Sequence, residues 1–328
     1  MGAMSGRGPI AATSDASEDS KRMKVLISGG SGFIGRQLAA SLLQGGHEVV
    51  VLSRQLEMRH PQKGVRYVSW DPHTADGDWI KEVSGAQGVV NLAGTSIGSW
   101  PWTRQKMAEI LSSRLSATAA LVQALERTPA ERRPSVLVSA SGIDYYGDRA
   151  DEAITEDSDA GDSFLARLSQ QWEVEAEKAQ PLGVRVVCIR TAMVFGREAL
   201  AFRLLTLPFR FFVGGPLGNG RQWFTWIHID DIVGLYRLAL EDTRVSGPLN
   251  AVAPDVRREH ELAKEIGRVL HRPALLPAPA FALKLVLGKQ AQLLLHGRRA
   301  QPAKALAYGY RFQFGGLPEA LEDTLRRR

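Results

Sequence analysis

A glycine-rich turn near the start of the chain constrains the fold more than any other sequence feature. It follows the apolar run Lys24–Ser28 and precedes a stretch with helical apolar spacing. Such a turn needs residues without a Cβ when the backbone approaches a pyrophosphate and the helix packs near the strand. The free N–H groups of the helix N-terminus also favour an anion. The alternative is a tight turn that serves packing alone. We expect a dinucleotide site, with cofactor contacts from Gly29, Ser31, Gly32, Phe33, Ile34 and Gly35.

Short β-branched runs alternate with longer helical patterns along much of the chain. The expected strands are Lys24–Ser28, Glu48–Leu52, Arg66–Ser69, Gly88–Leu92, Ser135–Ser139 and Val184–Arg190. The expected helices are Phe33–Gln44, Thr103–Arg127 and Ser163–Gln180. The strands are almost continuously apolar, as is typical when both faces of a sheet are covered. The pattern predicts an α/β fold with a Rossmann-like, doubly wound parallel sheet.

The alternation loosens after about residue 190, where a glycine-rich loop and proline-separated helical segments follow. We expect residues 23–250 to form the dinucleotide-binding domain, with part of a substrate lobe at 191–225. Residues 251–328 should form a smaller, mainly helical C-terminal substrate region. Residues 1–22 are rich in Gly, Ala and Ser and lack the apolar core of a signal peptide, so we expect a disordered tail.

The end of the second expected strand distinguishes between the two nicotinamide cofactors. An acid there binds the ribose 2′-hydroxyl of NAD, whereas an arginine accommodates the 2′-phosphate of NADP. This chain has Ser53 and Arg54 and no acid, which favours NADP (NADPH) and makes NAD the weaker choice. A surface arginine on the loop is the alternative. Further cofactor contacts are expected from Asp71 and from Leu92, Ala93 and Gly94 after the fourth strand.

The amino-acid composition limits the cellular compartments and the classes of partner that can be expected. A single cysteine, Cys188, excludes an intramolecular disulfide and a thiolate-rich metal site, which fits the cytoplasm. No apolar stretch reaches the length of a bilayer span, and no residue cluster has metal-ligand spacing. Residues 181–328 hold 22 Lys and Arg against 12 Asp and Glu. This excess fits an anionic ligand or an ordinary charged surface. Without a lysine-rich or aromatic-interleaved run, we expect no nucleic-acid partner, and we expect no membrane partner either.

Several segments resemble the extended, epimerase-like branch of the short-chain dehydrogenase/reductase superfamily. They are the turn at Gly29–Gly35, Asn91–Gly94, Tyr145–Asp148, Trp172–Glu173, Gly214–Gln222, Trp226–Asp231 and Tyr308–Phe312. More narrowly, the chain is similar to the atypical "epimerase family" group, which ends in a small C-terminal domain of unknown function. The resemblance covers roughly residues 23–325. It implies a bound nicotinamide dinucleotide, a cleft beside the smaller region, and no known substrate.

The resemblance also implies catalytic machinery that this chain lacks in part. Active members use a Tyr as general acid/base and a Lys four residues later that lowers its pKa. Here the segment Phe164–Leu168 has Phe and Leu at those positions, and a shift of one residue offers only Leu165 and Ser169. The family's serine position is retained at Ser141. We expect Ser141 with Tyr145 or Tyr146 to replace the missing pair; the alternative is that both tyrosines pack the loop.

Other polar and aromatic residues are candidates for ligand contacts. Arg114 either reaches the cofactor from the long helix or pairs with an acid. The expected substrate contacts are Arg190, Arg221, Trp223 and His228. In extended relatives the segment of His228 mainly joins the substrate lobe to the sheet, and Arg221 has the alternative of a surface loop residue.

Two functions therefore remain open from the sequence. The first is an NADP-dependent oxidoreductase or epimerase that acts on a small molecule, with phosphorylated and nucleotide-linked compounds among the candidates. The second is an NADP-binding sensor without turnover, which the missing Tyr and Lys favour. The sequence does not decide between a monomer and a homodimer formed through the long helices.

Overall fold

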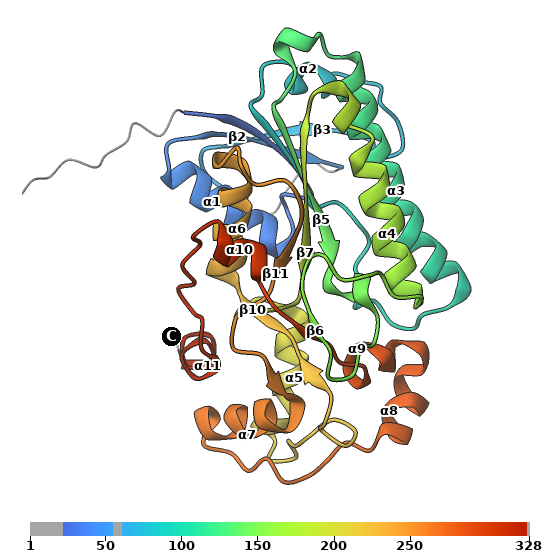
Figure 1. Cartoon of the computed structure of the whole chain (residues 1–328), viewed down its shortest axis with the longest axis vertical. Helices are drawn as coiled ribbons and strands as arrows, with labels where there is room; N and C mark the ends of the chain where they lie inside the picture. Colours follow the sequence, from blue (N-terminus) through green and yellow to red (C-terminus); the bar gives the residue numbers. More distant parts are fainter. Residues whose placement is uncertain (1–21, 55–60, 327–328) are drawn as a thin grey trace, which may run out of the picture.

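A seven-stranded parallel sheet forms the centre of the molecule (Figure 1). The computed structural model describes residues 22–54 and 61–326. The strands are β1 (Lys24–Ser28), β2 (Glu48–Ser53), β3 (Val65–Ser69), β4 (Gly88–Asn91), β5 (Val136–Gly142), β7 (Arg185–Thr191) and β11 (Gly247–Ala251). Their order is β11-β7-β5-β4-β1-β2-β3, so the chain changes direction across the sheet between β3 and β4. The carboxyl ends of β1 and β4 therefore flank the switch point where such sheets bind ligands.

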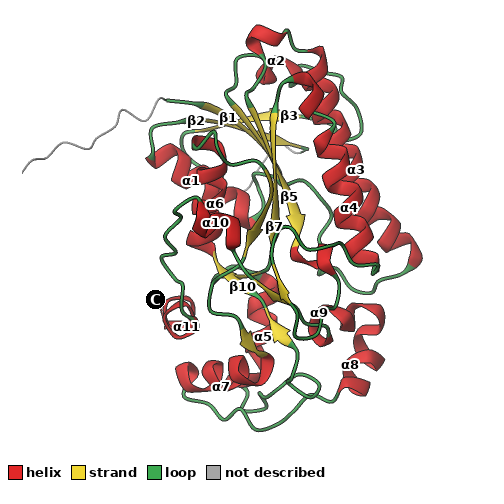
Figure 2. Cartoon of the chain, in the orientation of Figure 1, coloured by secondary structure: helices red, strands yellow, loops and turns green. Residues whose placement is uncertain are grey.

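Helices cover both faces of this sheet (Figure 2). The main ones are α1 (Phe33–Gln44), α3 (Arg104–Arg127), α4 (Phe164–Glu177) and α6 (Ile229–Glu241), and α2 (Ile80–Val83) is short. Leu38 of α1 and Leu235 of α6 pack with one face of the strands, whereas Leu121 of α3 and Ala176 of α4 pack with the other. The predicted Rossmann-like architecture is confirmed.

The predicted elements agree with the observed ones to within three residues at each end. The apolar runs became strands because their side chains are buried on both faces: Val25, Leu26 and Ile27 have no exposed surface. Cys188 in β7 is likewise buried, and burial raises the pKa of its thiol. No described helix has the length and apolar character needed to cross a membrane.

A second, smaller lobe adjoins the carboxyl ends of the strands (Figure 1). Its helices are α5 (Leu200–Arg210), α7 (Glu259–Leu270), α8 (Ala280–Leu287), α9 (Gln292–Leu295), α10 (Ala303–Ala307) and α11 (Leu317–Arg326). Its strand pairs are β8 (Met193–Phe195) with β10 (Trp226–His228), β9 (Trp223–Phe224) with β12 (Arg257–Arg258), and β6 (Ala153–Ile154) with β13 (Arg299–Ala300). Phe195, Phe202, Trp226 and Leu262 lie in its apolar core.

Two separate parts of the chain build this lobe. The segment 191–225 leaves the sheet after β7, and the residues after β11 contribute α7 to α11. Strand β11 ends at Ala251, and α10 from the following part of the chain packs against that strand, so the boundary near residue 251 stays a prediction. Apart from Arg22, the predicted tail lies outside the described residues.

The free energy of unfolding is expected to depend on pH because of Glu259 in the smaller lobe. Its carboxylate is buried at the start of α7 and accepts a hydrogen bond from the Leu217 N–H at 2.8 Å. Burial raises its pKa from 4.5 to about 7. The folded state therefore binds a proton that the unfolded state has lost, and the free energy of unfolding falls as pH rises from 4.5 to about 7.

Replacing Glu259 by glutamine should remove this slope while keeping a hydrogen-bond acceptor for Leu217. At pH 8 the variant should be more stable than the parent protein by up to about 3 kcal/mol. Urea unfolding across the pH range measures the difference. Glu126→Gln, an equal charge change at an exposed site on α3, should leave the slope unchanged. An unaltered slope in Glu259→Gln would contradict the assignment.

Candidate functional site

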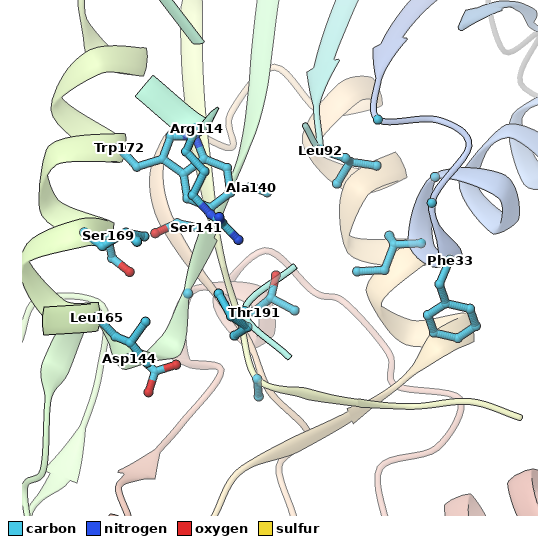
Figure 3. Close-up of a pocket in the computed structure, with 18 of the residues that line it drawn as sticks. Phe33, Leu92, Arg114, Ala140, Ser141, Asp144, Leu165, Ser169, Trp172 and Thr191 are labelled. Carbon is cyan, nitrogen blue, oxygen red and sulfur yellow. The ribbon is translucent and has the colours of Figure 1, made fainter. Parts of the chain in front are cut away.

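A cavity of about 360 Å³ lies at the carboxyl ends of β1, β4, β5 and β7 (Figure 3). The glycine-rich turn and the start of α1 form one side of it, and α4 forms the opposite side. Its lining residues include Gly29, Gly32, Phe33, Ile34, Gly35, Leu92, Arg114, Ser141, Leu165, Ser169, Trp172 and Thr191. The cavity thus brings together most of the predicted cofactor residues and one of the three predicted catalytic residues.

The glycine-rich turn has the shape that the sequence predicted. Gly29 has φ +71°, and a Cβ there would lie 2.6 Å from the Leu92 carbonyl. A Cβ on Gly35 would lie 2.6 Å from the Gly29 oxygen. No side chain caps the first turn of α1, whose N-cap residue is Gly32, so free backbone N–H groups face this end of the cavity. The turn therefore offers a cradle that fits a pyrophosphate.

Three of the predicted cofactor residues contribute to this region without lining the cavity. Ser31 is exposed, and its carbonyl accepts a hydrogen bond from Arg36. The Ala93 N–H donates to Asn91, which holds the turn after β4. Gly94 lies against Arg114, since a Cβ on it would be 3.0 Å from the Arg114 Cγ.

Arg114 is a buried cation without a carboxylate partner among the described residues. Its Nη1 donates to the carbonyls of Thr95 and Ile110, both at 2.9 Å, and its buried Nε has no partner. The guanidinium lies 5.0 Å from the Trp172 ring and points toward the cavity (Figure 3). Burial lowers its pKa to about 10. A desolvated charge of this kind is costly unless an anion joins it.

The residues expected to choose between the cofactors lie at the ends of β2 and β3. Ser53 is buried at the end of β2, and Arg54 follows it with an exposed side chain. Asp71 is exposed after β3, and its carboxylate accepts a hydrogen bond from the His73 N–H at 2.9 Å. Their contact with a cofactor stays a prediction.

The face of α4 toward the cavity carries neither a tyrosine nor a lysine. Leu165 and Ser169, four residues apart, line the cavity, with Leu168 and Trp172 beside them. Ser169 is therefore the hydroxyl on this face, and Phe164 packs instead in an apolar cluster with Trp102. The sequence pattern offered both registers, and the helix selects the one that starts at Leu165.

Ser141 ends β5 at the cavity wall and connects to a buried polar network. Its hydroxyl donates to the Glu173 carboxylate at 2.6 Å. The same carboxylate receives Nε and Nη2 of Arg190 at 2.9 and 2.7 Å. Since the Ser141 proton is engaged by Glu173, the serine oxygen can only accept a hydrogen bond from a ligand.

Both predicted tyrosines lie behind this network and do not line the cavity. Tyr146 is fully buried; its hydroxyl donates to Asn250 at 2.8 Å and accepts from Arg190 at 2.7 Å. Burial raises its pKa to about 12. Tyr145 is half-buried, with its ring 3.4 Å from the Arg190 guanidinium carbon. Neither tyrosine is therefore among the residues that line the cavity, and the prediction that one of them replaces the missing tyrosine stays a prediction.

Two predicted substrate contacts, Arg190 and His228, are buried outside the cavity. Arg190 is 3% exposed, and its guanidinium donates hydrogen bonds to the Glu173 carboxylate and the Tyr146 hydroxyl. His228 is 1% exposed, caps α6 by accepting the Asp230 N–H, and its ring centre lies 3.9 Å from that of Phe314. Burial lowers its pKa. Neither residue is among those that line the cavity, and their contact with a substrate stays a prediction.

Arg221 and Trp223 lie in the smaller lobe and outside the cavity. The Trp223 indole donates to Asp151 at 2.8 Å, and the Arg258 guanidinium carbon lies 4.0 Å from its ring centre. The side chain of Arg221 is exposed at the end of the glycine-rich loop. Their contact with a substrate stays a prediction.

The sequence missed three contributors to the site. Glu173 holds Ser141; Asp144 lines the cavity and pairs with Arg298 at 2.7 Å. Gln290 is buried and donates to the carbonyls of Ile97 and Ser99, which fixes the loop at the cavity mouth. The helical spacing of Leu165, Ser169 and Trp172 could have identified the lining face of α4, but no local pattern marks Gln290.

Comparison with protein families agrees with this geometry. Residues 25–251 match the NAD dependent epimerase/dehydratase family, and residues 278–324 match a domain of unknown function, DUF1731. The Bacillus subtilis epimerase family protein YfhF is 36% identical over 307 residues, covering 93% of this chain and 99% of that protein. The human epimerase family protein SDR39U1 is 37% identical over 309 residues, covering 92% of this chain and 100% of that protein.

Solved structures of epimerase family proteins are also similar to this chain. The structure of human SDR39U1 (isoform 2) with NADPH has a TM-score of 0.83 and 36% identity, covering 93% of this chain and 100% of that one. A nucleoside-diphosphate sugar epimerase from Corynebacterium glutamicum has a TM-score of 0.74 and 32% identity, covering 94% of this chain and 59% of that one. UDP-N-acetylglucosamine 4-epimerase from Bacillus cereus shares the fold, with a TM-score of 0.72 and 20% identity over 92% of this chain and 95% of that one.

Proposed function

Because this chain belongs to the NAD-dependent epimerase/dehydratase family, we propose that it binds NADPH in the cavity and acts as an oxidoreductase or epimerase on a small substrate. The observation that carries the proposal is Arg114, a buried cation without a carboxylate partner among the described residues, in the same cavity as an uncapped helix N-terminus. Both features favour the phosphate groups of a dinucleotide. The human relative solved with NADPH supports the choice of NADP over NAD.

Each part of the proposed cofactor has a residue suited to it. The backbone N–H groups after Gly29 would hold the pyrophosphate, and Arg114 would supply a compensating positive charge. Ser53 and Arg54 would hold the 2′-phosphate at the end of β2. When bound, the nicotinamide supplies or accepts a hydride. The chain itself binds and orients the reactants and excludes water.

The substrate would meet Ser141 and the apolar face of α4. Since the Ser141 oxygen can only accept from a ligand, it suits a hydroxyl group of the substrate better than a carbonyl. Leu165, Leu168 and Trp172 would cover the apolar part of a small molecule. Nucleotide-linked and phosphorylated compounds remain the candidate substrates.

A second function, an NADPH-binding sensor without turnover, is favoured by one observation. The cavity-facing pair on α4 is Leu165 and Ser169, so no phenol and no ammonium group stands where a general acid/base pair would act. Such a protein would keep the cofactor cradle and lose the proton transfer.

Thermal unfolding with NADPH and NADH tests the binding, and absorbance of NADPH during a substrate screen tests the turnover. Saturating NADPH should raise Tm, because a ligand that binds only the folded state stabilises it. No shift with either cofactor would contradict both functions. Turnover of any carbonyl or nucleotide-sugar substrate supports the enzyme, whereas tight binding without turnover supports the sensor.

Arg54 should determine the preference for NADPH. Replacing it by alanine should weaken NADPH binding by about tenfold to a hundredfold, because one charge-assisted contact to the 2′-phosphate is lost. NADH, which lacks that phosphate, serves as the internal control and should bind unchanged. Titration of both cofactors by fluorescence measures the ratio. Equal weakening of NADPH and NADH would show that Arg54 does not read the 2′-phosphate.

A further inference from the structure

Most of the exposed large apolar side chains of the described residues lie at one end of the molecule. They belong to α5, α8 and the loops beside them, at the end opposite α2 (Figure 1). Phe211 is 69% exposed, Leu275 79% and Leu285 84%. We call this set the lobe-end patch: Leu200, Leu204, Leu207, Phe211, Phe212, Val213, Leu275, Leu276, Phe281, Leu285 and Val286.

The backbone segments that carry the lobe-end patch adjoin one another. The segments 214–218 and 276–278 run side by side, because the Leu276 N–H donates to Gly214 at 3.2 Å and the Ala278 N–H to Pro216 at 2.8 Å. The Arg272 guanidinium carbon lies 4.4 Å from the Phe212 ring centre. On α5, the spacing of Leu200, Leu204 and Leu207 places them on one helical face that leads to Phe211. Helix α8 begins directly after the paired segments.

The two chain segments that carry the patch contain basic residues and no acidic ones. Residues 199–222 and 271–297 contain Arg203, Arg210, Arg221, Arg272, Lys284 and Lys289 and not a single Asp or Glu. Arg210 and Lys284 are exposed and form no ion pair within the described part of the chain. A hollow of about 540 Å³ next to the patch is lined by Lys264, Arg268, His271, Arg272 and Leu275. Arg268 there pairs with Glu265 and Glu322.

We propose that the lobe-end patch binds the surface of a membrane that contains anionic lipid. Exposed Phe and Leu side chains beside unpaired Arg and Lys are the combination that enters the interface between headgroups and acyl chains. Each basic residue near such a surface adds attraction to the anionic headgroups. A second copy of the chain would bring like charges face to face, which opposes that partner. The proposed contact is peripheral, and it differs from the expectation of no membrane partner that was drawn from the sequence alone.

Co-sedimentation with vesicles tests the proposal on the full chain. One vesicle type contains phosphatidylcholine alone, and the other contains phosphatidylcholine and phosphatidylglycerol in equal parts. Two double variants alter the patch: Arg210→Glu with Lys284→Glu removes charge, and Phe211→Ser with Leu285→Ser removes apolar surface. All four side chains are exposed, so folding should persist and is checked by thermal unfolding. If one pair fails to fold, the other pair decides.

The matched controls lie outside the patch. Lys63→Glu with Arg104→Glu makes the same change of charge, and Val174→Ser removes an exposed apolar side chain from α4. We expect binding to the anionic vesicles only, a loss of at least tenfold in both patch variants, and an unchanged partition in both controls.

Three results would overturn the proposal. The first is absence of binding to anionic vesicles, or equal binding to vesicles of phosphatidylcholine alone. The second is a loss of binding in both charge variants, that of the patch and that of the control, while the apolar patch variant binds normally. This result would mean that the protein adsorbs by charge and does not insert apolar side chains. The third is a patch variant that changes the mass measured by light scattering and leaves vesicle binding intact, which would assign the patch to a second copy of the chain.

Discussion

Replacing Arg114 by methionine is expected to weaken NADPH binding by about tenfold to a hundredfold and to leave the stability of the ligand-free protein nearly unchanged. The affinity falls because a charge-assisted contact to a phosphate group is lost. Stability changes little because two opposing contributions change together. The variant loses two hydrogen bonds to the carbonyls of Thr95 and Ile110, and it also removes a buried charge without an ion-pair partner in the described structure. Fluorescence titration and urea unfolding measure the two quantities separately.

The lysine variant at the same position is the matched control. Arg114→Lys keeps a positive charge, so it should recover part of the affinity that the methionine variant loses. The opposite pattern, a marked loss of stability with normal NADPH affinity, would mean that Arg114 serves the packing of α3 against Trp172 and not the cofactor.

The second large effect is expected at the ion pair beneath Ser141. Replacing Glu173 by leucine should lower the free energy of unfolding by about 3–5 kcal/mol, because it leaves the Arg190 guanidinium buried without its partner. Burial alone would lower the pKa of Arg190, but the hydrogen bonds and charge of Glu173 outweigh burial and raise that pKa. Urea unfolding at neutral pH measures the loss.

A double variant separates the pair from its surroundings. If the loss comes from the unpaired guanidinium, Glu173→Leu combined with Arg190→Met should be more stable than Glu173→Leu alone. Additive losses in the double variant would contradict this explanation. Glu177→Gln, on the same helix and outside this ion pair, serves as the control for a charge change on α4.

Much of the fold was predictable because its causes are local. The run Lys24–Ser28 is apolar and forms a strand, and glycines follow it because a Cβ on Gly29 or Gly35 would lie 2.6 Å from backbone atoms. The face of α4 that meets the cavity was ambiguous by one residue, since Phe164–Leu168 fits a helix in either register. Only packing against α3, where Trp172 lies near Arg114, decides it.

The site was less predictable because its polar contacts join distant parts of the chain. Tyr146 meets Asn250, 104 residues away, and Gln290 meets Ile97, 193 residues away. Arg190 has the sequence context of a ligand-binding residue at a strand end, yet its guanidinium forms an ion pair with Glu173 on α4. A residue type at the right edge of a sheet therefore predicts proximity to the cavity and does not predict which partner it will choose.

Because Cys188 is buried, its alkylation can be used to measure unfolding of this chain. The only thiol in the sequence lies 2% exposed in β7, between β5 and β11, so an alkylating reagent reaches it when the sheet opens. When opening and closing are fast relative to alkylation, the labelling rate follows the equilibrium population of open molecules. Mass spectrometry of labelled protein would then follow the opening of this strand without an engineered probe, in the parent protein and in variants of the Glu173–Arg190 pair alike.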